Sequence, residues 1–240
     1  MLTIHAEGLD HQRLNERIRA LEGPLSITGC LGQRFIAAGL GCGSIELTGV
    51  PGNALGAYLN GAQLTVRGNA QDAVGDTMND GRIIVYGSIG DAAGYAMRGG
   101  EMFIRDNAGY RAGIHMKEYE EKRPVMVIGG RCGSFLGEYQ AGGIIIVLGL
   151  GKGHGNIVGD FPCTGMHGGR MFLRSNCSSI RFPKNVTVSP ASPSDLAEID
   201  AYVTRYCALF GAEKRAVMDA PFTKIVPDSK NPYKQMYVAN

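Results

Sequence analysis

A glycine that returns every nineteen residues constrains the fold of this chain more than any other feature. The clearest series is Gly56, Gly75, Gly94 and Gly113. An apolar residue follows each of these glycines three positions later, and a short apolar run follows that residue. The first three runs are Leu64–Arg67, Arg82–Tyr86 and Glu101–Arg105, and the fourth, Val125–Ile128, is delayed by the charged insert Lys117–Arg123.

The pattern resumes after the insert. Gly137, Gly142 and Gly143 precede the apolar run Ile144–Leu148, and Gly168 and Gly169 precede the run Arg170–Arg174. The stretch from Gly52 to Arg174 therefore contains six repeats. Cys163 stands in the last repeat where the register predicts a glycine, so the geometry of that corner is open. A fixed period of about twenty residues is typical of a solenoid, in which each unit buries its apolar face against its neighbours.

Each repeat holds one clear strand and several glycines at turns. This favours an all-β solenoid, a parallel β-helix whose successive coils stack about 4.8 Å apart. Glycine suits the corners because it adopts positive φ without steric strain. The apolar residues Leu59, Met78, Met97 and Met116 then form a ladder in the interior. Leucine-rich and helical repeats are disfavoured, because no repeat holds a ten-residue segment of helical period.

Residues 1–50 are expected to hold an N-terminal cap and the first, irregular coils. Asp10 is a plausible N-cap of a short helix that carries Leu14, Ile18 and Leu21 on one face and ends at Gly23-Pro24. Such a helix could cover the open end of the solenoid. We expect the first strands at three segments, Leu25–Thr28, Arg34–Ala37 and Ile45–Thr48.

Residues 51–190 are expected to form the glycine-repeat β-helix, and 191–240 a helix and an extended arm. Ser192-Pro193-Ser194-Asp195 is a strong helix start, and an amphipathic helix runs from there to Gly211. Its apolar face either covers the last coil or docks on another subunit. The first alternative places short helical caps at both ends of the solenoid. Lys224–Asn240 has no periodic pattern and is interpreted as an arm.

Composition excludes several classes of function. The chain has 24 basic and 22 acidic residues with no basic cluster, so neither nucleic acid nor a membrane is expected as a partner. The longest apolar run is far below the roughly 18 residues of a membrane span, and the N-terminus does not resemble a signal peptide, so a cytoplasmic protein is expected. The six cysteines include no C-x-x-C pair. We expect most of them to be buried thiols, with no metal site.

No set of residues predicts catalysis. Met1-Leu2 lacks the N-terminal nucleophile of a self-activated amidotransferase. His115 beside Lys117, Glu118 and Glu121, and His167 with Cys163, could each be drawn as reactive groups, but solvation and packing explain them better.

The glycine-rich stretch Gly149–Gly155 superficially resembles a phosphate loop, yet no helix follows it. We therefore predict no catalytic, cofactor-binding or metal residue. The repeat glycines Gly56, Gly75, Gly94, Gly113, Gly137 and Gly168 are expected to be structural. The charged insert is the candidate for partner docking, through Lys117, Glu118, Tyr119, Glu121 and Arg123.

Several motifs together carry a family resemblance. They are Gly52–Gly56, Gly68–Asp72, Gly94–Gly100, Gly113–Lys117 and Gly165–Gly169. As a set they resemble the C-terminal glycine-repeat domain of the glutamate synthase large subunit, in the stand-alone form found where that subunit is split into separate polypeptides. The glycine-repeat subunit of formylmethanofuran dehydrogenase is similar over the repeats.

The resemblance implies a right-handed β-helix that belongs to an oxidoreductase of glutamate biosynthesis and nitrogen metabolism but holds none of its catalytic groups. In the family, glutamine hydrolysis and the FMN and iron–sulfur chemistry that yields glutamate from glutamine and 2-oxoglutarate lie on other domains. The implied partners are an amidotransferase subunit and an FMN/iron–sulfur synthase subunit, and a homo-oligomer is compatible with this.

Three alternatives stay open. The chain could be a scaffold in a formylmethanofuran dehydrogenase complex or in an N-methylglutamate synthase complex. It could also be a free-standing β-helix enzyme with a site on its outer face. Such an enzyme would need exposed carboxylates or aromatics at the coil period, and Asp72 and Asp91, nineteen residues apart, are the one such pair found.

Overall fold

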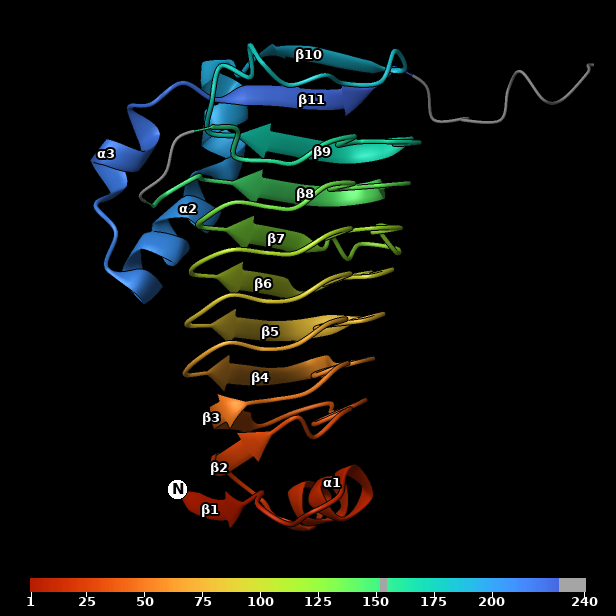
Figure 1. Cartoon of the computed structure of the whole chain (residues 1–240), viewed down its shortest axis with the longest axis vertical. Coiled ribbons are helices and arrows are strands. Elements are labelled where there is room, and N and C mark those ends of the chain that lie inside the picture. The colour runs from red at the N-terminus through yellow and green to blue at the C-terminus, as the bar shows by residue number, and fades with distance from the viewer. Residues whose placement is uncertain (152–154, 229–240) are drawn as a thin grey trace, which may run out of the picture.

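The computed structural model describes residues 1–151 and 155–228. One eleven-stranded sheet contains every strand, in the order β1-β2-β3-β4-β5-β6-β7-β8-β9-β11-β10. Strands β1 to β9 are parallel, whereas β11 is antiparallel to both β9 and β10. The strands stack into a solenoid of about eight turns (Figure 1), which confirms the predicted all-β solenoid.

The solenoid strands are short and evenly spaced. Their bounds are β1 Leu2–His5, β2 Leu25–Leu31, β3 Ser44–Val50, β4 Asn60–Val66, β5 Asp80–Val85, β6 Glu101–Ile104, β7 Val125–Ile128, β8 Ala141–Val147, β9 Gly168–Leu173, β10 Val186–Pro190 and β11 Thr223–Pro227. The helices are α1 His11–Ala20, α2 Pro193–Phe210 and α3 Lys214–Met218.

Strand register places one ladder of large side chains inside the solenoid. Leu64 pairs with Ile83, Ile83 with Met102, and the ladder continues through Met126 and Ile145 to Met171. All of these side chains are fully buried. Because successive residues of a strand point to opposite faces, the intervening positions lie on the outer face of the sheet. The residues of the predicted ladder, Leu59, Met78, Met97 and Met116, are fully buried as well, so the core is a column of stacked apolar side chains.

The corners before the strands share an unusual backbone. Every second residue has positive φ; in the coil that leads to β4 these are Ala54, Gly56 and Tyr58. Their amides donate alternately to the two neighbouring coils. Ala54 N and Tyr58 N bond carbonyls of the next coil at 2.9 and 2.7 Å, and Gly56 N bonds Ile36 O of the preceding coil at 2.9 Å. Each corner between the first and the last is therefore tied to the coils on both sides.

The repeat glycines are required by side chains of the following coil. A Cβ on Gly94 would lie 2.3 Å from Met126 Cε, and one on Gly113 would lie 2.4 Å from Ile145 Cδ1. Gly56, Gly75 and Gly137 occupy the same corner position with φ of 64–68°. The predicted structural glycine Gly168 instead begins β9, where a Cβ would lie 2.0 Å from Ala141 O.

The corner with Cys163 keeps the common geometry. Cys163 has φ of 61°, close to the glycines at the equivalent positions. The strand stacked on this coil's strand β9 is the antiparallel β11, so the strict repeat ends here. The Cys163 Sγ lies 3.6 Å from Met171 Sδ inside the core. Cysteine therefore replaces glycine in the last coil, where no side chain of a following parallel coil packs against the corner.

Helix α1 covers the N-terminal end, as predicted (Figure 1). The Asp10 side chain caps it by accepting from Arg13 N at 2.8 Å, and Leu14 and Ile18 are buried in the core. The Asn15 side chain donates to Phe35 O and accepts from Ala37 N at 2.9 Å. These bonds replace the hydrogen bonds that a preceding coil would supply.

The predicted strand at Arg34–Ala37 is wrong. Phe35 and Ala37 have φ of 56° and 58°, so the segment is the first of the positive-φ corners. Ile36 is fully buried, which explains why the segment looked like a strand. Over so few residues, an apolar corner and an apolar strand have the same pattern of side chains.

The C-terminal helix forms where predicted, but α2 runs along the outer face of β6 to β9 and does not cap the end of the solenoid (Figure 1). Ile199, Val203 and Tyr206 pack there on the apolar outer rows of these strands, including Phe103 and Phe172. The end of the solenoid is covered by β11 and β10. The apolar outer rows decide this placement, because exposure of Phe103 and its neighbours would be unfavourable.

Part of the predicted arm is a strand. Thr223–Pro227 forms β11, with Ile225 fully buried. Residues 229–240, the remainder of the arm, lie outside the described residues. Five of the six cysteines are buried and Cys42 is exposed, which confirms the prediction that most are buried thiols.

We predict that Gly94→Ala destabilises the protein more than Gly39→Ala. Both glycines have φ near 65–70°, but a Cβ on Gly39 meets nothing within 4 Å. The shared backbone strain therefore cancels, and the clash with Met126 should lower the free energy of unfolding by about 1–3 kcal/mol more in Gly94→Ala. Urea unfolding of both variants measures this difference. Equal destabilisation would contradict the proposed fit between corner and side chain.

A second prediction concerns Asp195 in the first turn of α2. The ammonium of Lys224, 2.7 Å away, and the capping bonds from Ser192 lower the pKa of Asp195 from 3.8 to about 2, against the opposing effect of burial. Because this pKa is depressed in the folded state, the stabilisation is present above the unfolded value and is lost as the pH falls toward 2. The difference in melting temperature between the wild type and Asp195→Asn should narrow from about pH 7 to about pH 3. A difference independent of pH would contradict this.

Candidate functional site

The charged insert Lys117–Arg123 forms a small hairpin before β7. Tyr119 and Lys122 exchange backbone hydrogen bonds of 3.1 and 3.0 Å. The Glu118 carboxylate accepts from Gly143 N at 3.1 Å. A Cβ on Gly142 would lie 2.4 Å from Glu118 N, so this glycine lets the hairpin approach the start of β8 closely.

Ion pairs fix the insert to two other segments, β5 and α2. Lys122 Nζ lies 3.2 Å from an Asp80 oxygen on β5. Arg123 contacts Glu118 at 3.2 Å within the insert and Glu198 of α2 at 3.3 Å. Glu198 also accepts from Arg170 of β9 at 2.8 Å. These pairs are partly exposed, so each contributes roughly 0–1 kcal/mol, but together they define the orientation of the hairpin.

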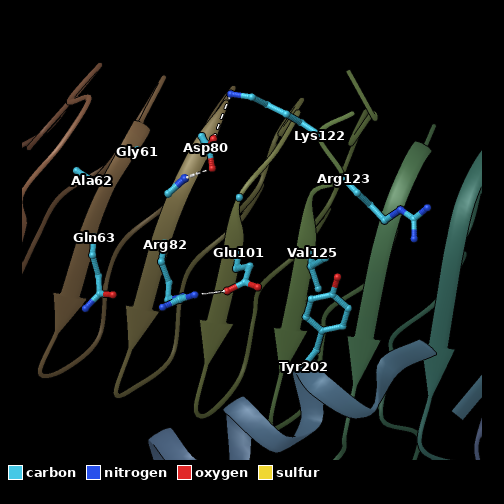
Figure 2. A pocket seen from close by; sticks show the side chains of 12 residues that line it. Gly61, Ala62, Gln63, Asp80, Arg82, Glu101, Lys122, Arg123, Val125 and Tyr202 are labelled. Atoms are coloured by element: carbon cyan, nitrogen blue, oxygen red, sulfur yellow. Dashed lines mark hydrogen bonds and ion pairs between the residues drawn. The ribbon is translucent and has the colours of Figure 1, made fainter. Parts of the chain in front are cut away.

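The first of two clefts beside the insert lies over the starts of β4 to β7 (Figure 2). It encloses about 460 Å³. Lys122 reaches across it to Asp80, and Tyr202 of α2 points into it from the opposite side. Gly61 of β4, Gly81 of β5 and Gly100, which directly precedes β6, line part of it, so backbone is accessible there.

The charges of the first cleft are internally matched. Arg82 lies 2.8 Å from Glu101, and Glu101 also pairs with Arg205 of α2. Burial alone would raise the pKa of Asp80, but the Gly81 amide and the Lys122 ammonium lower it below the ordinary value. The cleft therefore presents paired charges and no isolated charge that would select a charged ligand.

The second cleft lies on the other side of the insert and encloses about 630 Å³. Lys117, Glu118 and Arg123 of the insert line it, together with His167 and Arg170 near and in β9. Among the described residues, Lys117 has no ion-pair partner. Its lining has three cationic side chains to one carboxylate, whereas the lining of the first cleft has three to two, so the second cleft is the more cationic.

The structure thus brings three of the five predicted docking residues together. Lys117, Glu118 and Arg123 share the second cleft, and Arg123 also lines the first. Tyr119 and Glu121 are exposed on the hairpin. Sequence reasoning missed the residues of α2 and β9 that complete the surface, Arg170, Glu198, Tyr202 and Arg205. The polar face of the amphipathic helix indicated that these residues could contact another segment, but the sequence did not show that this segment is the insert.

The two histidine candidates have structural surroundings. His115 stacks on Tyr139, with ring centroids 5.1 Å apart and planes at 11°, and meets Tyr95 edge to face. His167 Nδ1 lies 3.0 Å from Gly165 O. Burial raises the pKa of the Cys163 thiol to about 12, so Cys163 remains protonated at neutral pH. A protonated thiol in the core is a poor nucleophile.

Asp72 and Asp91 are bonded to backbone amides of the next coil. Asp72 Oδ1 accepts from Asp91 N at 2.9 Å, and Asp91 Oδ1 accepts from Tyr110 N at 2.8 Å. Asn69 and Asn107 form the same kind of bond elsewhere on the coils. The carboxylates at the coil period, the one feature that favoured a free-standing enzyme, thus join successive coils.

Two further sequence candidates concern ligand sites. Within 1–151 and 155–228, no group of three or more His, Cys, Asp or Glu side chains is placed to hold a metal ion. Lys152–His154 of the glycine-rich stretch Gly149–Gly155 lie outside the described residues, so its interpretation as an excursion between coils stays a prediction.

Comparison with known proteins decides the family. The model of the family described as "GXGXG motif" matches residues 14–229. The chain belongs to the GXGXG motif family. This confirms the relation to the glutamate synthase C-terminal domain that the glycine motifs indicated.

Two relatives of this GXGXG motif protein are informative. The uncharacterized protein MJ1350 of Methanocaldococcus jannaschii is 42% identical over 250 residues, which cover 98% of this chain and 96% of the relative. A chain of the formyltransferase/hydrolase complex of Methylorubrum extorquens, solved with methylofuran, matches with a TM-score of 0.61. It is 22% identical, and the match covers 85% of this chain and 78% of that one. At this identity the likeness shows the shared fold. Among the described residues, every helix is too short or too polar to cross a membrane.

We predict that Asp91 stabilises the coils of this GXGXG motif protein through its hydrogen bond. Asp91→Ala removes the acceptor for Tyr110 N and should lower the free energy of unfolding by about 1–2 kcal/mol. Asp91→Asn keeps an oxygen acceptor and serves as the matched control, with a smaller loss. Urea unfolding of both variants tests this. If the two variants were equally unstable, the carboxylate charge and not the hydrogen bond would be responsible.

Proposed function

We propose that this chain is a non-catalytic β-helix scaffold subunit of a glutamate synthase-type complex, which forms glutamate from glutamine and 2-oxoglutarate. The subunit would hold an amidotransferase subunit and an FMN/iron–sulfur synthase subunit in a fixed relation. The FMN and the iron–sulfur cluster would be bound by the partner subunits, and the complex would work in the cytoplasm.

One observation carries the scaffold role. The polar side chains that recur at the coil period, such as Asp72 and Asp91, accept hydrogen bonds from the backbone of the next coil. An enzyme site on the outer face of the coils would need such groups free to contact a substrate. Here the same groups support a rigid body, which is the property that a scaffold requires.

The insert supplies a surface for contact with a partner. Its hairpin projects from a scaffold that is rigid on both sides, and loops of this kind commonly carry binding residues. Lys117 and Arg123 border the more cationic second cleft, and Tyr119 is 51% exposed beside them. Tyrosine and arginine are enriched in protein interfaces. We therefore assign partner docking to Lys117, Glu118, Tyr119, Glu121 and Arg123.

Fixed geometry has a mechanistic purpose in such a complex. Ammonia released by glutamine hydrolysis must reach a second active site before it escapes to water. Backbone hydrogen bonds between successive coils make the solenoid resist bending, so it can fix the distance between two bound subunits. If the partner subunits transferred ammonia equally well without this chain, this mechanism would have to be abandoned.

A second candidate is a scaffold subunit of a formylmethanofuran dehydrogenase-type complex. It is favoured by the likeness in fold to a chain of the formyltransferase/hydrolase complex. An N-methylglutamate synthase-type complex would use the same scaffold role. The two candidates differ in the partner subunits and agree on the function of this chain within them.

Affinity purification from the native source, followed by mass spectrometry, distinguishes these proposals. We expect recovery with an amidotransferase and a flavin and iron–sulfur synthase polypeptide, while the isolated chain shows no visible absorbance. Formyltransferase or hydrolase polypeptides in their place would favour the second candidate. A chain that came alone and turned over a substrate would overturn the scaffold proposal.

A further inference from the structure

The positive-φ corners that precede the strands stack along one narrow edge of the solenoid (Figure 1), and exposed aromatic side chains are concentrated in these corners. We name this surface the aromatic edge. Its six exposed aromatic members are Phe35, Tyr58, Tyr95, Tyr110, Tyr139 and Phe161, with exposed fractions from 37% to 61%. Within the described part of the chain, one other aromatic residue, Tyr119, is comparably exposed. Such a concentration is typical of a surface that another molecule covers.

The rings of the aromatic edge are held in place before any partner binds. His115 stacks on Tyr139 and meets Tyr95 edge to face, and the ring centroids of Phe135 and Phe161 are 5.2 Å apart. The Arg111 guanidinium lies over the Phe135 ring at 5.1 Å. Rigid aromatic and arginine side chains lose little conformational entropy on association, which is why they dominate binding energy at interfaces.

The aromatic edge has margins of opposite character. In the coils that lead to β6, β7 and β9, the margin three residues before the central corner residue (Gly94, Gly113 or Cys163) contains Asp91, Tyr110 and Asp160, all exposed. The first corner departs from this, with the exposed Arg34 at the same position. The margin four residues after it contains Arg98, Lys117 and His167, of which Arg98 and Lys117 are exposed. Neither Arg98 nor Lys117 has an ion-pair partner among the described residues.

We propose that the aromatic edge is a self-association surface at which two copies of this chain pack side by side with parallel solenoid axes. A two-fold axis parallel to the solenoid places every coil against the same coil of the second copy and exchanges the two margins. Asp91 then faces Arg98, Tyr110 faces Lys117, and Asp160 faces His167, each pair occurring twice because the interface is isologous. The pairs are two unlike-charge or polar contacts and one contact of a cation with an aromatic ring.

An antiparallel dimer and a different protein both fit the aromatic edge less well than a parallel second copy. With antiparallel solenoids the margin that carries Arg98 and Lys117 would face itself, and like charges in contact are strongly unfavourable. A different protein would have to present both signs of charge at the coil spacing of about 4.8 Å. A second copy presents them by symmetry, at the same heights and in the complementary order.

The first test is sedimentation of the full chain over a range of concentrations. We expect a monomer–dimer equilibrium that weakens as salt is added. Arg98→Glu places a carboxylate opposite Asp91 twice per dimer and should raise the dimer Kd about tenfold or more. Arg17→Glu is the matched control, because Arg17 is exposed on α1 at the end of the solenoid and should leave the Kd unchanged. A monomer at every concentration, or equal effects of both variants, would overturn the proposal.

The second test reports the orientation directly. Tyr95 lies between Asp91 and Arg98 in the sequence of one corner, so the two copies should bring their residues 95 together at the two-fold axis. In a Cys42→Ser background, which removes the exposed cysteine of the described chain, Tyr95→Cys should form a disulfide-linked dimer on mild oxidation. Val188→Cys, exposed on β10 away from the edge, should remain monomeric under the same conditions. Cross-linking of Val188→Cys and not of Tyr95→Cys would contradict the parallel arrangement.

Self-association through the aromatic edge and the proposed scaffold role can fail separately, although Lys117 is assigned to both surfaces. A chain that co-purifies with amidotransferase and synthase polypeptides but is a monomer alone would overturn the dimer and leave the scaffold role intact. A chain that dimerises through Arg98 and Tyr95 but recovers no other polypeptide would do the reverse.

Discussion

Successive coils are held at the separation of a parallel sheet, and the rest of the structure depends on this contact. At each corner, alternate amides donate to the coil before and the coil after, so no corner can shift without breaking bonds on both sides. Side chains of one coil must then fit beside the backbone of the next. The glycine at Gly94 and the methionine at Met126 are two halves of one such fit.

The same constraint limits where function can lie. Polar side chains that face the neighbouring coil are used in joining it, as Asp72 and Asp91 are. Segments that depart from the period are free of this requirement. Two such segments are the insert Lys117–Arg123 and helix α2, which line the clefts. The aromatic side chains that point outward from the corners are also free of this requirement, and they form the aromatic edge. In this fold, binding surfaces are therefore formed by the segments and side chains that lie outside the regular coils.

Core positions tolerate a departure when the local packing supplies a replacement. Gln140 stands where other coils have methionine, and it is fully buried. Its Nε2 donates to Gly142 O and Gly143 O at 3.1 and 3.2 Å, while its Oε1 has no partner among the described residues. The side chain thus bonds the backbone at the start of β8. A single polar residue is accommodated within an otherwise apolar ladder.

The nineteen-residue period by itself determined the solenoid, the interior ladder and the corner glycines, because each follows from spacing along the chain. The caps of α1 and α2 were also predictable, since the hydrogen bonds of Asp10 and Ser192 join residues three apart. The segment Arg34–Ala37 was misjudged because a buried corner and a buried strand look alike over four residues. Only the tertiary structure decided that α2 lies on the outer face of β6 to β9 and that Glu198 meets Arg123, 75 residues away in sequence. Such contacts depend on how the coils place distant segments in space, and no local pattern of residues records that distance.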